Sequence, residues 1–124
     1  MSWDFSLCDV VTGKILETEE KHFMKGGTYC IDGTREMSLN ITGNYSDIIS
    51  NAFEPYEDSY LSYAYILADK TGAESIPLLK NAINKLSDDV NDDYWKATEG
   101  NAKRALQQLL ALAQIRPDGI WHVC

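Results

Sequence analysis

The stretch DGTREMSLNIT, from Asp32 to Thr42, indicates most clearly what kind of fold this chain adopts. An Asp-Gly pair favours the positive φ angles of a tight type I′ turn between two strands. After the turn, apolar side chains alternate with polar ones at Met37, Leu39 and Ile41, which is the period of a half-buried strand. The pattern predicts a hairpin in which Thr28 to Ile31 and Arg35 to Thr42 are joined at Asp32-Gly33.

The residues before this hairpin also predict strands. Apolar Trp3, Phe5 and Leu7 alternate with polar residues, so residues 2–8 fit a strand with one buried face. A turn over Asp9 to Gly13 then leads into a second strand over Lys14 to Glu20. The first forty residues therefore read as antiparallel hairpins.

The middle of the chain leaves two alternatives open. Ser46 is suited to cap a short helix that ends near Pro55. The tyrosines that follow fit one helix face at Tyr56, Tyr60 and Tyr63, whereas one strand face would carry Leu61, Tyr63 and Tyr65.

Two helices are expected in the second half. Residues 75–87 carry apolar side chains at helical spacing, and Pro77 fits the first turn if Ser75 is the cap, with Thr71 to Glu74 as a preceding turn. A second helix should begin at Thr98 and run to about Gln114, and residues 120–123 should pack back as a strand or an extended segment. We expect a single α+β domain over residues 1–124, with N-terminal antiparallel β-hairpins packed against two main C-terminal helices.

Composition narrows the classes of function. The 124 residues include 11 Lys and Arg against 19 Asp and Glu, which gives a net charge of −8. Residues 1–62 hold 4 basic and 11 acidic side chains, whereas residues 63–124 hold 7 and 8, so the halves carry −7 and −1. Because nucleic-acid polymers are bound through clustered Lys and Arg, we expect no nucleic-acid partner. An acidic half suits a basic protein partner, or simply keeps the chain in solution.

No apolar run approaches the ~18 residues of a membrane span, and no basic-then-apolar segment opens the chain. The three cysteines, Cys8, Cys30 and Cys124, lack metal-ligand spacing and are expected to be reduced thiols. We expect a cytoplasmic protein without membrane contact.

Catalytic patterns are weak. The two histidines, His22 and His122, occur in no nucleophile motif, so we expect neither an enzyme nor a cofactor. The aspartates at positions 88, 89, 92 and 93 lack the spacing of a calcium loop, and we expect no metal site.

Polar and aromatic residues suggest a binding site instead. Lys103 and Arg104 follow the Thr98 cap within two turns and could grip a phosphate. Side-chain amides and a hydroxyl that could hydrogen-bond a ligand are present at Asn40, Asn44, Tyr45 and Asn101. Tyr94 and Trp121 supply aromatic rings that could stack on it. A basic outer helix face, turns at strand ends and core packing explain the same residues.

Six segments carry a resemblance to a family: GGTY (26–29), LNIT (39–42), KTGAESIP (70–77), DYW (93–95), GNAKRAL (100–106) and RPDGIW (116–121). In these the chain resembles small proteins encoded by phages and prophages of Gram-positive bacteria. Its residues 47–69 differ from the family pattern, as does Gly43, where the family has Tyr. The resemblance implies a phage-encoded protein in the host bacterial cytoplasm, and no specific activity.

Two functions of different classes follow as hypotheses. The first is a phage counter-defence protein that sequesters a small nucleotide immune signal, such as a cyclic ADP-ribose-like molecule, without catalysis. The second is an acidic inhibitor of a host defence complex, similar in action to an anti-CRISPR protein, which would use charge to bind a basic host protein. A homo-oligomer is compatible with either, since ligand pockets often form between subunits.

Overall fold

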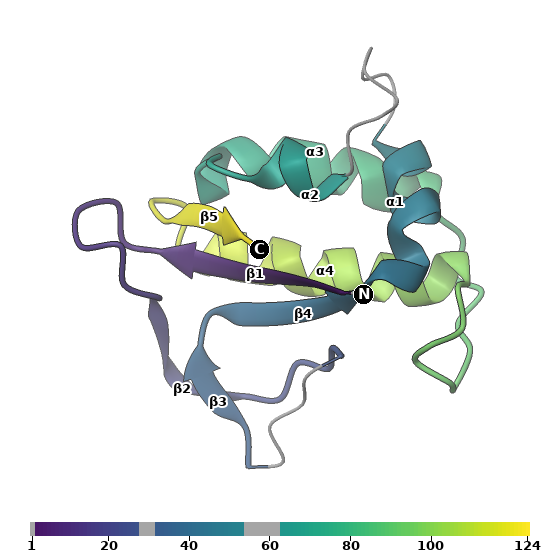
Figure 1. The fold of residues 1–124 in the computed structure, drawn as a ribbon, viewed down its shortest axis with the longest axis horizontal. Coiled ribbons are helices and arrows are strands. Elements are labelled where there is room, and N and C mark those ends of the chain that lie inside the picture. The colour runs from purple at the N-terminus through teal and green to yellow at the C-terminus, as the bar shows by residue number, and fades with distance from the viewer. Residues whose placement is uncertain (1, 28–31, 54–62) are drawn as a thin grey trace.

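A computed structural model of the chain describes residues 2–27, 32–53 and 63–124. Its main sheet has three antiparallel strands in the order β4-β1-β5, namely β4 (Ser38–Thr42), β1 (Ser2–Cys8) and β5 (Ile120–Val123). The central strand comes from the N-terminus and one edge strand from the C-terminus, so both ends of the chain lie in one sheet (Figure 1). The predicted strands at residues 2–8 and 120–123 are confirmed.

The single strand predicted over Arg35 to Thr42 is instead two strands. β3 (Thr34–Glu36) pairs with β2 (Glu17–His22) in a separate two-stranded ribbon, whereas β4 pairs with β1. The break falls at Met37, whose side chain is fully buried and whose backbone bonds to Leu7 and Leu16. Periodicity continues through the break because Met37 stays on the apolar face, so sequence alone could not reveal the change of partner.

The expected partners of the N-terminal strands are also corrected. Gly33 has the positive φ predicted for the Asp-Gly turn, but Thr28 to Ile31, its proposed partner strand, lies outside the described residues. The turn over Asp9 to Gly13 is confirmed, and Leu16 still hydrogen-bonds to Leu7. Beyond it, the chain leaves β1 and forms β2 at Glu17–His22, later than the predicted Lys14 to Glu20.

Short helices fill the middle of the chain. A 3₁₀ turn over Gly43–Tyr45 leads into α1 (Ser46–Ala52). The Thr42 hydroxyl caps the 3₁₀ turn by accepting from the Asn44 amide at 3.2 Å, whereas the N-cap of α1 is Tyr45, which makes no side-chain capping bond, so the predicted cap at Ser46 is wrong. α2 (Tyr63–Leu67) is helical, which decides the alternative for Tyr63 and Tyr65 in favour of a helix. Pro55, Tyr56, Tyr60 and Leu61 lie outside the described residues.

The two long helices are α3 (Gly72–Lys85) and α4 (Glu99–Ile115). The cap of α4 is Thr98, as predicted, but α3 begins three residues before the predicted Ser75. Thr71 and Glu74 form a complete capping box, which holds Pro77 inside the helix rather than in its first turn. Thr71 and Ser75 are both suitable N-cap residues, and the reciprocal pair of hydrogen bonds between Thr71 and Glu74 makes Thr71 the N-cap of α3.

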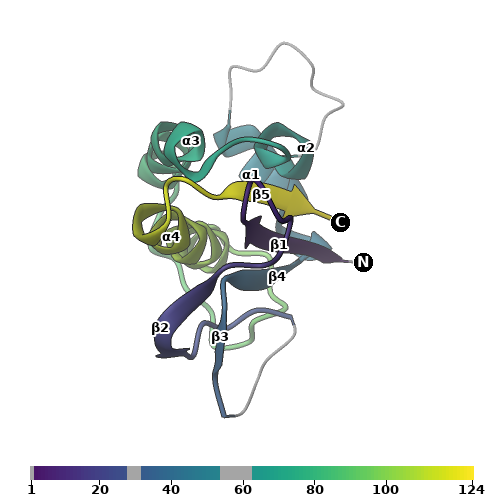
Figure 2. The ribbon, with the colours of Figure 1, turned by 90° about the vertical axis from the view of Figure 1, so that its left-hand side faces the viewer.

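α3 and α4 pack against each other and on one face of the main sheet (Figure 2). Phe5 and Leu7 of β1, Leu39 and Ile41 of β4 and Trp121 of β5 are all buried in that interface. The fold is therefore the α+β arrangement that the sequence predicts, with N-terminal antiparallel strands and C-terminal helices. Among the helices of the described ranges, none has the length and apolar character needed to cross a bilayer.

Candidate functional site

A pocket of about 400 Å³ lies beside the first half of α4. One wall is the helix itself, through Asn101, Arg104 and Gln108. The opposite walls are the loop that carries Tyr94 and Trp95 and the segment Lys25-Gly26. Three of the eight residues predicted to bind a ligand, Tyr94, Asn101 and Arg104, thus line one pocket.

Arg104 supplies a positive charge that is free to bind. Its side chain is exposed on α4, and no hydrogen bond or ion pair joins its guanidinium to another group in the part of the chain that the structure describes. Lys25 adds a second cation to the lining and Asp92 a carboxylate. The pocket is therefore a locally cationic place on a chain whose net charge is −8.

Trp95 offers the exposed ring of the pocket. Its side chain is 54% exposed, and its indole lies edge-on to the ring of Tyr94, with the centroids 4.9 Å apart. Tyr94 is half-buried and serves as a support: its hydroxyl accepts from the Thr42 amide at 3.1 Å and donates to the Asn40 carbonyl at 3.3 Å. Burial raises the pKa of Tyr94, so its hydroxyl stays protonated and can donate.

Asn101 holds the aromatic loop in place. It is almost fully buried, and its amide oxygen accepts from the Asn91 amide at 3.0 Å. Its amide nitrogen donates to the carbonyls of Asp93 and Lys96, at 3.0 and 3.1 Å. These bonds occupy the amide, so the contribution of Asn101 to the pocket is to fix the shape of residues 91–96.

Asn44 and Tyr45 act on the same loop from the other side. The Asn44 amide donates to the Trp95 carbonyl at 3.0 Å, and the buried Tyr45 hydroxyl donates to the Tyr94 carbonyl. Burial raises the pKa of Tyr45 to about 12, against a small opposing effect from the nearby Arg104. Neither residue lines the pocket; both support the backbone that presents Trp95.

The segment Lys25-Gly26 is attached to the helix and to the sheet. Gln108 binds the backbone of Lys25 twice, accepting from its amide at 2.8 Å and donating to its carbonyl at 2.9 Å. The amide of Gly27 donates to the Asn40 carbonyl at 3.0 Å. The side chain of Asn40 donates from Nδ2 to Ser2 and Asp4, and its Oδ1 lies against Gly27.

Two predicted residues lie elsewhere. Lys103 forms an ion pair with Asp88, with the two charged atoms 2.8 Å apart, and does not line the pocket. Trp121 is fully buried, and its Nε1 donates to the hydroxyl of Ser75 at 2.9 Å. An enclosed ring has no free face for a ligand, whereas the indole of Trp95 is exposed.

Sequence reasoning missed Lys25, Trp95 and Gln108 as pocket residues. Gln108 and Lys25 are 83 positions apart, and no local pattern connects them. Trp95 had a usable signal, because a large aromatic residue next to several aspartates is poorly suited to a core. The described residues contain no group of three or more His, Cys, Asp or Glu placed to hold a metal ion.

The pocket thus combines two cations, an exposed indole and walls fixed by hydrogen bonds. Guanidinium and ammonium groups bind phosphate or carboxylate oxygens, and an indole face stacks on planar rings. Comparisons with family models, with curated proteins and with solved structures gave no match for this chain.

Proposed function

We propose that this protein binds a small nucleotide-derived ligand in the pocket beside α4 and sequesters it without chemical change. The observation that carries the proposal is the guanidinium of Arg104, which has no hydrogen-bond or ion-pair partner among the described residues, in the same pocket as the exposed indole of Trp95. A nucleotide has the two matching parts, an anionic phosphate and a planar base.

The charge of the pocket supports an anionic ligand. A net charge of −8 repels anions from the surface as a whole. Lys25 and Arg104 oppose that field locally, with Asp92 as the one carboxylate in the described lining. A ligand with a single phosphate or pyrophosphate and a neutral ring therefore fits better than a polyanion.

The rigid walls support binding as the main task. Asn101 fixes the loop, and Gln108 fixes Lys25, so both sides are held by bonds to α4. A pocket shaped in advance loses little conformational entropy when a ligand enters, which favours affinity. Tight retention of a scarce signal requires this property.

The setting of the proposal comes from the resemblance to phage and prophage proteins. A phage gains from removing a nucleotide signal with which its bacterial host triggers defence. We therefore propose a counter-defence role in the host cytoplasm, with a cyclic ADP-ribose-like molecule as the kind of signal. Assembly into a homo-oligomer is part of this proposal and would be measured beside binding.

A thermal-shift screen tests the proposal directly. Purified protein is heated with individual nucleotide second messengers and cyclic ADP-ribose isomers, and a ligand that binds the folded state raises the Tm. Any ligand is then recovered after denaturation and identified by chromatography. Stabilisation with intact ligand supports sequestration, recovery of a product shows an enzyme, and no shift with any nucleotide overturns the proposal.

Two neighbouring substitutions locate the site. Arg104→Gln should weaken binding by about 10- to 100-fold, because a charge-assisted contact to phosphate is lost. Lys103→Gln removes the same charge from the same helix outside the pocket, and its affinity should stay near that of the wild type. Equal losses in both variants would assign the effect to the general field and not to this pocket.

A further inference from the structure

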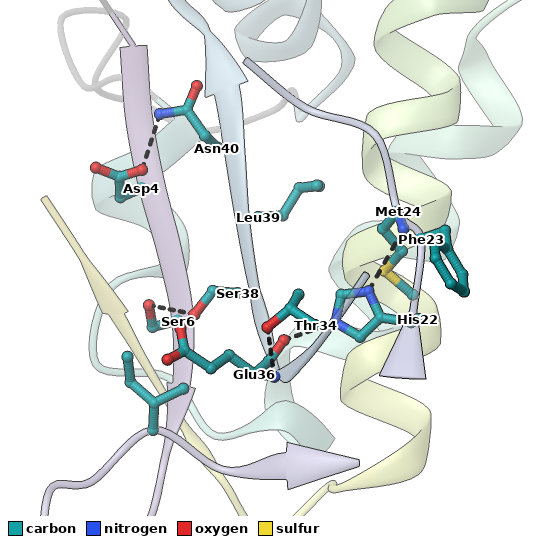
Figure 3. A pocket seen from close by; sticks show the side chains of 11 residues that line it. Asp4, Ser6, His22, Phe23, Met24, Thr34, Glu36, Ser38, Leu39 and Asn40 are labelled. Atoms are coloured by element: carbon teal, nitrogen blue, oxygen red, sulfur yellow. Dashed lines mark hydrogen bonds between the residues drawn. The ribbon is translucent and has the colours of Figure 1, made fainter. Parts of the chain in front are cut away.

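The main sheet has a second face, opposite α3 and α4, that carries polar side chains. Asp4 and Ser6 of β1 and Ser38 and Asn40 of β4 all belong to it, alternating with the buried Phe5 and Leu39. Figure 3 shows these four side chains on the side of the strands that faces the β2–β3 ribbon. None of them belongs to the pocket beside α4.

Two hollows lie on this face. One, of about 270 Å³, lies between β1, β4 and the β2–β3 ribbon, and Asp4, Glu36 and His22 line it (Figure 3). The other, of about 340 Å³, lies over β1 and β5, and Asp9 and Asp69 line it. Both are lined by Ser6 and Ile15, so they adjoin. We call the two together the sheet groove.

The sheet groove is acidic. Its described lining holds four carboxylates and no Lys or Arg. None of the four forms an ion pair with a residue of the described ranges. Asp4 accepts from Asn40 at 2.8 Å, and Asp9 accepts from the amides of Val11 and Thr12, which lower the pKa of its carboxyl. Hydrogen bonds thus hold the carboxylates of Asp4 and Asp9 in place. Arg116, which does not line the groove, also lowers the pKa of Asp9, as the last and smallest of its causes.

Large apolar side chains stand along the same groove. Phe23 and Ile15 line the first hollow, and Val10 and Ile15 line the second. Phe23 and Val10 are each 59% exposed, and Ile15 is 40% exposed. Exposed apolar groups beside unpaired charges are typical of an interaction surface, because they gain by burial against a partner.

We propose that the sheet groove docks a basic segment of a partner protein. Lys or Arg side chains of that segment would meet Asp4 and Glu36, and its apolar side chains would cover Phe23 and Ile15. This surface is separate from the ligand pocket, so the two proposals can fail independently.

A peptide probe tests the charge and the location together. The probe is a fluorescein-labelled synthetic peptide of alternating Arg and Leu, with a Glu and Leu peptide for comparison, and binding is read by anisotropy. The double variant Asp4→Asn with Glu36→Gln should bind the basic peptide about 5- to 30-fold more weakly. Its matched control, Glu19→Gln with Glu20→Gln, changes the net charge equally outside the groove and should lose less than about twofold.

Backbone amide NMR spectra complete the test. They show whether each variant is folded, and on titration of the wild type the perturbed amides should include Ser6, Ser38 and Asn40. No binding of the basic peptide, equal losses in both double variants, or perturbations confined to other surfaces would each overturn the proposal. Sedimentation measures the oligomeric state and tests whether a second copy of this chain occupies the groove. A homodimer that only the Asp4→Asn with Glu36→Gln variant dissociates would show such a copy and would also overturn the proposal.

Discussion

The indole Nε1 of Trp121 donates a hydrogen bond to the hydroxyl of Ser75, 2.9 Å away and fully buried. The same hydroxyl donates to the carbonyl of Gly72 at 2.7 Å, so one serine joins strand β5 to the first turn of helix α3. Both polar groups are satisfied inside the core, where an unpaired donor or acceptor is costly.

Ser75→Ala should therefore destabilise the protein by about 1–3 kcal/mol, because it leaves the Trp121 N–H without a partner. Urea denaturation measures the change. Ser87→Ala, at an exposed position just beyond the same helix, should change stability by less than about 0.5 kcal/mol. In a double-mutant cycle with Trp121→Phe, additive effects would contradict the proposed coupling.

Asn101→Ala should both destabilise the protein and weaken the ligand pocket. The substitution removes three hydrogen bonds to the backbone of residues 91–96, at a cost of about 2–4 kcal/mol. Since this loop presents Trp95, affinity for any ligand found in the thermal-shift screen should also fall. Gln107→Ala, on the exposed face of the same helix, is the control and should leave both unchanged. Unchanged affinity in folded Asn101→Ala would show that the loop is not part of the binding site.

Much of the fold can be predicted from local patterns. The alternation over residues 2–8 fixes β1, and the Thr98 cap with its apolar stripe fixes α4, because both signals depend on neighbours in sequence. The pairing partner of a strand, in contrast, does not depend on neighbours in sequence. Met37 belongs equally well to a long hairpin strand or to a corner between two sheets, and only its bonds to Leu7 and Leu16 decide between them.

The site was less predictable for the same reason. Arg104 and Tyr94 could be singled out by residue type, and both line the pocket. Trp121 has the same chemistry as Trp95, but β5 carries it into the core while Trp95 stays on a surface loop. The attachment of Lys25 to Gln108 joins two segments that no spacing relates. Chemistry could be read from the sequence, whereas exposure and distant pairing required the structure.

The capping box of α3 predicts a pH dependence. The Glu74 carboxylate accepts from the Thr71 amide at 3.0 Å, and that bond lowers the pKa of Glu74 below its usual value. A lowered folded-state pKa adds stability above the unfolded value of about 4.3, and this stability is lost as the pH falls through the folded value. The Tm of the wild type should therefore exceed that of Glu74→Gln at about pH 6, and the gap should close towards about pH 3. A gap that stays constant over this range would contradict the assignment.

Gly26 is required by the close approach of its segment to strand β4. A methyl group at this position would overlap the carbonyl oxygen of Asn40, a backbone atom that cannot rotate away. Gly26→Ala should therefore push Lys25 and Gly27 off the strand, break the hydrogen bond from Gly27 to Asn40 and cost about 1–3 kcal/mol. Urea denaturation gives the cost, and shifts in the amide spectra of Gly27 and Asn40 show the displacement.

Lys25→Ala is the matched control. It removes an exposed side chain but keeps the backbone bonds to Gln108, so the free energy of unfolding should stay the same while the affinity for an anionic ligand falls. A Gly26→Ala protein with wild-type stability and unshifted amides would show that the added methyl group fits without moving the segment, and would contradict the requirement for glycine at this position.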